Sequence, residues 1–159
     1  MQLPANQLTK RFWRYGPLLF WLLVIFFAST NHFSKDNTTK TIGPFLQWAF
    51  SNFSEQTIDF MIILIRKSGH FIGYALLAFL AARALISSIK PWVHLNWFYW
   101  SLFIIIIYSI TDEYHQSFEI TRSASLQDCL IDIAGGLTYL IIYSLIRNKK
   151  LKKESIKNG

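Results

Sequence analysis

Long apolar stretches dominate this sequence and limit the folds that it can adopt. Four of them lie at about residues 15–30, 68–89, 95–111 and 126–146. A helix needs about 20 mostly apolar residues to cross the hydrocarbon core of a bilayer, with roughly 17 as a practical minimum. The second and fourth stretches reach that length, and the first and third are slightly short. The pattern therefore predicts a helical membrane protein with four spans.

A soluble four-helix bundle is the alternative interpretation of the same pattern. Such a bundle would need a polar outer face on every helix. The runs LLFWLLVIFF at 18–27 and FIIIIYSI at 103–110 offer no such face. Charged residues make up only 16% of the chain, against roughly 25% in soluble proteins. We therefore predict an all-α, polytopic integral membrane bundle.

A fifth apolar stretch, residues 42–65, is more polar than the other four. It contains Gly43-Pro44 as well as Glu55 and Asp59, which suits an amphipathic external or re-entrant helix better than a span. Cytoplasmic loops are enriched in Lys and Arg. With four spans, eleven of the 16 cations lie on the inner side, whereas a fifth span would move the basic tail outside. Both termini are therefore predicted to be cytoplasmic.

This topology divides the chain into three parts. A basic cytoplasmic N-terminus, residues 1–14, precedes a membrane domain at 15–147, and a basic cytoplasmic tail follows at 148–159. Residues 15–30 also resemble a signal peptide, but the bulky Phe26-Phe27 before Ala28 favours an uncleaved signal-anchor. Because topology accounts for the basic tail, the net charge of +7 does not indicate nucleic-acid binding.

Polar residues concentrate at the predicted outer ends of spans two, three and four. Ionisable groups within a span cost several kcal/mol when they face lipid, so they normally face the bundle and pair. We expect the cations Lys67 and Arg122 to pair with four carboxylates, those of Asp112, Glu113, Asp128 and Asp132. The side chains of His70, Tyr74 and Gln116 would orient the cluster. The predicted pocket residues are Lys67, His70, Tyr74, Asp112, Glu113, Gln116, Arg122, Asp128 and Asp132.

The cluster has two interpretations. It is either a polar clasp that fixes helix packing or an outward-facing pocket that binds a ligand. Two carboxylates at each of two helix ends exceed what a clasp needs, which favours the pocket. Gly135 and Gly136 lack side chains, so another helix can approach the fourth span closely there.

The same residues fall in motifs that resemble those of the VanZ-like family. The segment RKSGHFIGY at 66–74 is similar to the K-x-x-H-x-x-x-Y signature of that family. The stretches at 111–116 and 122–128 resemble its D/S-E-x-x-Q and R-x-x-x-x-x-D patterns, and DIAGG at 132–136 resembles N/D-x-x-G-G. The resemblance covers residues 15–147, and it departs from the usual pattern at Asp132, where many relatives carry Asn.

The resemblance implies a small multi-pass protein of the bacterial plasma membrane that acts in cell-envelope physiology. Some relatives confer low-level resistance to teicoplanin-type glycopeptides. The implied partners are the lipid bilayer and a ligand such as a lipid-linked cell-wall precursor or a glycopeptide. The resemblance identifies no nucleophile and no bound metal, and the oligomeric state stays open.

Two other function classes remain open. An enzyme acting on a lipid-linked precursor would use His70 or Glu113 as a base, with Lys67 and Arg122 facing a phosphate. No nucleophile elbow or phosphatase signature is present, so a non-enzymatic role is favoured and no catalytic residue is assigned. A small proton-coupled transporter would relay protons through the carboxylates, but the inner halves of the spans offer few polar steps.

The sequence predicts neither a metal nor another cofactor. It contains no HExxH, HxH or paired-histidine motif, which are the usual arrangements of zinc ligands. The single cysteine, Cys129, lies within an apolar stretch. It can form neither an intrachain disulfide nor a cysteine-based zinc site.

Overall fold

The computed structural model describes residues 5–30, 35–118 and 125–158, and these residues form helices and turns without any strand. The predicted all-α class is therefore confirmed for this part of the chain. In chain order, the helices are α1 (Ala5–Ala28), α2 (Lys35–Ala49), α3 (Glu55–Ile86), α4 (Pro91–Leu95), α5 (Trp97–Gln116) and α6 (Leu126–Asn158).

Three helical segments in the described residues are long and apolar enough to cross a membrane. They are Thr9–Ala28, Glu55–Ile86 and Leu126–Lys157, which contain most of the first, second and fourth predicted spans. Large apolar side chains on these helices point away from the protein; Phe20, for example, is 66% exposed. An exposed apolar surface of this kind suits contact with lipid, so the chain is a membrane protein.

The boundaries of α3 differ from those predicted for the second span. The helix begins at Glu55 instead of residue 68, so residues 42–65 do not form one separate segment. Their first part belongs to α2, and their last part forms the first turns of α3. Ser54 caps α3 by accepting a hydrogen bond from the Thr57 backbone N–H at 3.3 Å. The negative charge of Glu55 in the first turn is stabilised by the positive end of the helix dipole.

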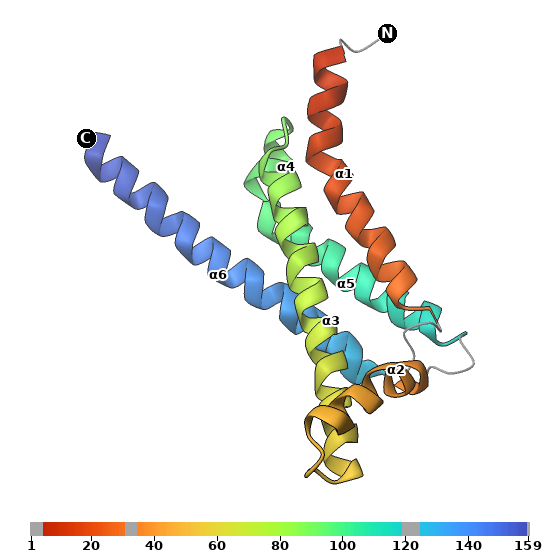
Figure 1. Cartoon of the computed structure of the whole chain (residues 1–159). Coiled ribbons are helices and arrows are strands. Elements are labelled where there is room, and N and C mark those ends of the chain that lie inside the picture. The colour runs from red at the N-terminus through yellow and green to blue at the C-terminus, as the bar shows by residue number, and fades with distance from the viewer. Residues whose placement is uncertain (1–4, 31–34, 119–124, 159) are drawn as a thin grey trace.

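The last helix also extends beyond its predicted span. α6 continues to Asn158 and includes the basic tail, because this region is rich in Lys, which favours helix, and has no Gly or Pro before Gly159. In Figure 1, the C-terminal half of α6 projects away from the other helices. The tail is therefore a helical extension of the bundle.

The long helix α3 lies at the centre of the molecule (Figure 1). Helices α1, α2, α5 and α6 all contact it. The start of α1 and the end of α6 lie at the same end of the bundle as α4, while α2 and the start of α6 lie at the opposite end. This opposite end, called the α2 end below, carries the polar residues discussed next.

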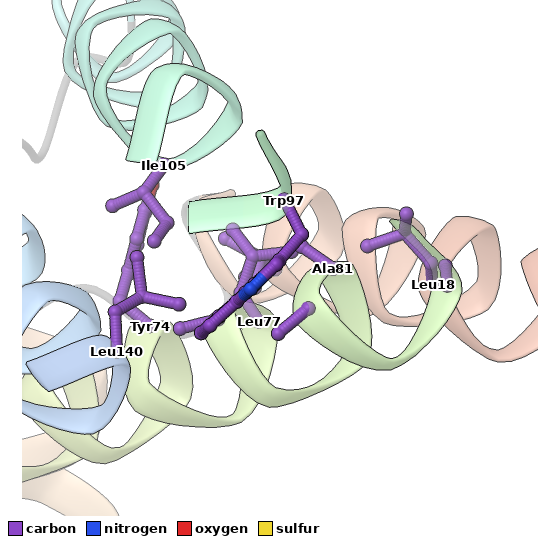
Figure 2. Packing of buried hydrophobic residues seen from close by; sticks show 11 residues of the cluster. Leu18, Tyr74, Leu77, Ala81, Trp97, Ile105 and Leu140 are labelled. Atoms are coloured by element: carbon purple, nitrogen blue, oxygen red, sulfur yellow. The ribbon is translucent and has the colours of Figure 1, made fainter. Parts of the chain in front are cut away.

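The buried apolar core joins α3 to its neighbours. Figure 2 shows Tyr74 reaching from α3 toward Ile105 of α5, beside Leu140 of α6. These three side chains are at most 1% exposed. On α3, four buried alanines at positions 78, 81, 82 and 84 provide the small surface that lets helices approach closely.

Close helix contacts occur at the two neighbouring glycines of α6. A Cβ atom on Gly135 would lie 2.2 Å from the backbone oxygen of Phe71 in α3. A Cβ atom on Gly136 would lie 2.8 Å from Cδ1 of Ile105 in α5. The predicted close approach to the fourth span is confirmed, and it involves two different helices.

Candidate functional site

Two pairs of charged or polar side chains connect α3 to α6 at the α2 end. Nζ of Lys67 lies 3.1 Å from Oδ1 of Asp128 and 3.2 Å from Oε1 of Gln127. One turn further along each helix, Nδ1 of His70 lies 3.0 Å from Oδ1 of Asp132. An α-helix completes a turn about every 3.6 residues, so residues three or four apart lie on the same face. The two pairs therefore lie one above the other along the contact between α3 and α6.

The deeper of these two pairs also involves α5. Asp132 is fully buried, and its second oxygen accepts a hydrogen bond from Oγ of Ser109 at 3.4 Å. The same hydroxyl lies 3.2 Å from the backbone oxygen of Cys129 and 3.2 Å from its sulfur. A buried carboxylate is costly unless it is paired and hydrogen-bonded. His70 and Ser109 supply these contacts and connect three helices.

The end of α5 holds three further predicted residues, all buried. Nε2 of Gln116 donates to Oδ2 of Asp112 at 3.1 Å within the helix. Oε2 of Glu113 accepts from the backbone N–H of Ser125 at 2.6 Å, just before α6 begins. A carboxylate at this place complements the positive end of the helix dipole. Glu113 therefore connects the end of α5 to the start of α6.

The structure brings most of the predicted residues together, and Lys67 forms one of the expected pairs, with Asp128. Glu113 also accepts from the Ser125 backbone N–H, and Asp132 pairs with His70. Tyr74 belongs to the apolar core, and no described residue bonds its hydroxyl. The predicted residue Arg122 lies outside the described residues. The ligand-binding role of the whole cluster stays a prediction.

A cavity of about 440 Å³ borders the polar cluster. It lies mainly between α1 and α3, and its wall includes Thr38 of α2 and Asp112 of α5. Of the predicted pocket residues that the structure describes, His70, Tyr74 and Asp112 line it. The remaining lining residues are Trp21, Val24, Ile25, Ala28, Ser29, Arg66, Gly69, Ile72, Gly73 and Leu76.

Neither the wall that α1 contributes nor the position of Arg66 in the cavity wall was predicted from the sequence. Two glycines give the signal that could have identified this face, because Gly69 and Gly73 share one side of α3 as a G-x-x-x-G motif. Such a motif usually marks close helix packing. Here a Cβ atom on either glycine would meet nothing within 4 Å. The missing side chains therefore leave open space along α3 at these two positions.

The chemistry available in this region is that of hydrogen bonding and charge. Within the ranges that the structure describes, no group of three or more His, Cys, Asp or Glu side chains is arranged to hold a metal ion. The cavity wall offers one guanidinium, one imidazole, one carboxylate and two aliphatic hydroxyls beside a larger apolar surface. This mixture suits an amphiphilic ligand.

Comparison with known proteins places this arrangement in a family. Residues 13–147 match the VanZ/LLP1 family. That range includes the cavity wall and all nine predicted pocket residues. No curated protein and no solved structure shows significant similarity to the chain. The resemblance found in the motifs between 66 and 136 is confirmed, and the chain belongs to the VanZ/LLP1 family.

Proposed function

We propose that this VanZ/LLP1 protein crosses the bacterial plasma membrane four times and that both termini are cytoplasmic. Helix α5, with 20 residues, is about 30 Å long at about 1.5 Å per residue, which matches the hydrocarbon core. It would form the third span. The distribution of cations supports this orientation, as does the position of α4 at the same end as the start of α1 and the end of α6 (Figure 1).

In this orientation the α2 end faces the outside of the cell. At 32 residues, α3 is about 48 Å long and exceeds the roughly 30 Å hydrocarbon core. Its first turns therefore extend into the outer interface, where α2 lies across them (Figure 1). Lys67 and His70 then stand near the boundary between lipid and external water.

The proposed activity is recognition of an amphiphilic envelope component from the outer side. A lipid-linked cell-wall precursor or a teicoplanin-type glycopeptide belongs to this class. Binding there would lower susceptibility to teicoplanin-type glycopeptides. One observation carries the proposal: the cavity adjoins the polar cluster, and His70 and Asp112 belong to both. A polar clasp alone accounts for the paired side chains but not for the cavity beside them.

The test compares teicoplanin susceptibility in a susceptible bacterial host. The strains express the wild type, His70→Gln, Asp112→Asn, Glu113→Gln or Arg122→Ala. We expect the wild type to lower susceptibility and the variants to lose most of that effect. Asp59→Asn is the matched control because it is an acid-to-amide change on the exposed face of α3. Immunodetection in the membrane fraction checks expression, and a wild type that behaves like the empty vector would rule out the resistance role.

The pairing of His70 with Asp132 favours a second function, acid–base catalysis on a lipid-linked precursor. Asp132 Oδ1 lies 3.0 Å from Nδ1 of His70, and no described residue bonds the other ring nitrogen. A histidine oriented in this way can accept or donate a proton at that nitrogen. Purified protein would then convert such a precursor under turnover conditions, as measured by mass spectrometry. His70→Gln would abolish the conversion, and unchanged precursor with the wild type would exclude this function.

A further inference from the structure

The cavity changes in character along α3. At the α2 end its wall carries Arg66 and His70, and toward the middle of the bundle it carries Ile72 and Leu76. Gly69 lies within the first pair and Gly73 within the second, and neither adds a side chain to the wall. The α3 wall is therefore polar at one end and apolar at the other.

Helix α1 repeats this change from the opposite side. Its direction is opposite to that of α3 (Figure 1), and Nε1 of Trp21 donates to the backbone oxygen of Gly73 at 2.9 Å. This bond places the apolar residues Trp21 and Val24 beside the apolar half of α3. Ser29, at the end of α1, then lies toward the polar half, together with Thr38 of α2.

The dimensions of the cavity match one leaflet of a bilayer. Arg66 and Leu76 are ten residues apart on α3, which corresponds to about 15 Å along the helix. The hydrocarbon core is about 30 Å thick, so this length is about half of it. The volume of about 440 Å³ lies within the roughly 300–1,000 Å³ of typical ligand sites. A polar channel across the membrane would need twice this length.

We propose that the cavity binds one lipid of the outer leaflet whose headgroup contains a phosphate. The hydrocarbon lies between α1 and α3 along Trp21 and Leu76, and the phosphate lies against Arg66. This inference rests on the outward orientation proposed above and names the ligand class of the same site. It also adds Arg66 to the binding residues, because Arg66 lines the cavity and the neighbouring Lys67 does not.

The polar end of the cavity provides the groups that such a headgroup needs. The guanidinium of Arg66 binds phosphate oxygens in a planar, charge-assisted geometry. Its Nη1 lies 3.4 Å from the hydroxyl of Thr38, which holds it toward α2. The carboxylate of Asp112 accepts hydrogen bonds from hydroxyls of the headgroup rather than from the phosphate itself. Gln116 keeps this carboxylate in place from the other side.

The experiment measures lipid binding to the full-length chain in a nonionic detergent by native mass spectrometry. Three probes separate the parts of the ligand: phosphatidylglycerol, diacylglycerol with the same acyl chains, and glycerol phosphate. We expect one phosphatidylglycerol to bind each chain. The other two probes should bind at least about tenfold more weakly, because each lacks either the charge-assisted contact or the apolar contact.

Two variants with matched controls test the assigned position. Arg66→Gln should weaken phosphatidylglycerol binding about tenfold, whereas Arg83→Gln, on an exposed position of the same helix, should leave it unchanged. Gly73→Leu should block binding by filling the cavity, whereas Ser68→Leu, an exposed position outside the wall, should not. Gly69→Leu replaces Gly73→Leu if circular dichroism shows loss of helix in the latter.

Each contrary outcome overturns the proposal. Equal binding of diacylglycerol means that the phosphate is not recognised, and equal binding of glycerol phosphate means that the site takes a free phosphate. Binding that survives both Arg66→Gln and the cavity-filling variant places the lipid elsewhere. If lipid does not bind but the wild type still lowers teicoplanin susceptibility, this inference fails and the proposed function stands. If lipid binds as expected but the wild type does not change teicoplanin susceptibility, this inference stands and the proposed resistance role fails.

Discussion

Gly135 of α6 packs directly against the backbone of Phe71 in α3. A Cβ atom on this glycine would lie 2.2 Å from the Phe71 backbone oxygen and 2.9 Å from its Cα. Real side-chain contacts are longer, and backbone atoms cannot move aside as the tip of a flexible side chain can. The pairs Lys67–Asp128 and His70–Asp132 connect the same two helices. The contact at Gly135 therefore sets the distance between α3 and α6 at which these pairs form.

Gly135→Ala is therefore expected to be destabilising despite the higher helix propensity of alanine. Overpacking of this kind typically costs about 1–3 kcal/mol, which exceeds the gain of about 1 kcal/mol from propensity. Gly69→Ala is the control, because its Cβ meets nothing within 4 Å and only the propensity gain applies. Thermal unfolding in detergent, followed by circular dichroism, measures both. Equal stability of the two variants would contradict the close contact.

The two pairs between α3 and α6 should respond very differently to mutation. Asp132 is fully buried and contacts both His70 and Ser109. Asp132→Ala removes the partner of the His70 Nδ1 atom and one hydrogen bond of Ser109, and should cost about 3–5 kcal/mol. Asp128→Ala breaks a pair whose side chains are 32% and 27% exposed and should cost at most about 1 kcal/mol. Denaturant unfolding measures both, and equal losses would contradict the difference in burial.

Asp132→Asn separates geometry from charge at the same position. The amide oxygen can accept from a neutral His70 that carries its proton on Nδ1, so most of the packing is retained. We expect a loss of about 1 kcal/mol, much smaller than that of Asp132→Ala. This variant also has the residue that the family resemblance suggests for many relatives. A loss as large as that of Asp132→Ala would mean that the negative charge itself holds the helices together.

Much of this arrangement follows from the sequence because it depends on helix periodicity. The spacing of Lys67, His70 and Tyr74 places them on one stripe, and two of these residues pair with the i, i+4 acids Asp128 and Asp132. The length of the apolar stretches likewise predicts membrane-spanning helices. These features are local, so a single sequence is sufficient to infer them.

The cavity is not predictable in the same way, because it depends on contacts between distant residues. Trp21 meets Gly73 across 52 positions of the chain, and no local pattern places α1 beside α3. The start of α3 was also missed, because the acids Glu55 and Asp59 argue against a membrane span. A cap at Ser54 nevertheless starts a helix there, since acids are favoured in a first turn whether or not it enters the membrane.

Glu113 should hold the start of α6 in place. Its Oε2 accepts the backbone N–H of Ser125 at 2.6 Å, and hydrogen bonds to a charged group contribute about 1.5–3 kcal/mol. Glu113→Ala is expected to increase hydrogen exchange at the amides of the first turn of α6, with Glu113→Gln retaining part of the protection. Glu55→Ala is the control on α3. No change in exchange near Ser125 would show that the contact does not order this helix start.

Trp21 should hold α1 to the bundle through one hydrogen bond. Trp21→Phe keeps an aromatic ring but removes the indole donor to the Gly73 backbone oxygen, and a hydrogen bond of this kind contributes about 0.5–1.5 kcal/mol. Lower thermal stability in detergent, followed by circular dichroism, is expected. Trp48→Phe makes the same change at a side chain that is 79% exposed and should have no effect. If both variants lose the same stability, the loss comes from the indole itself and not from its bond to α3.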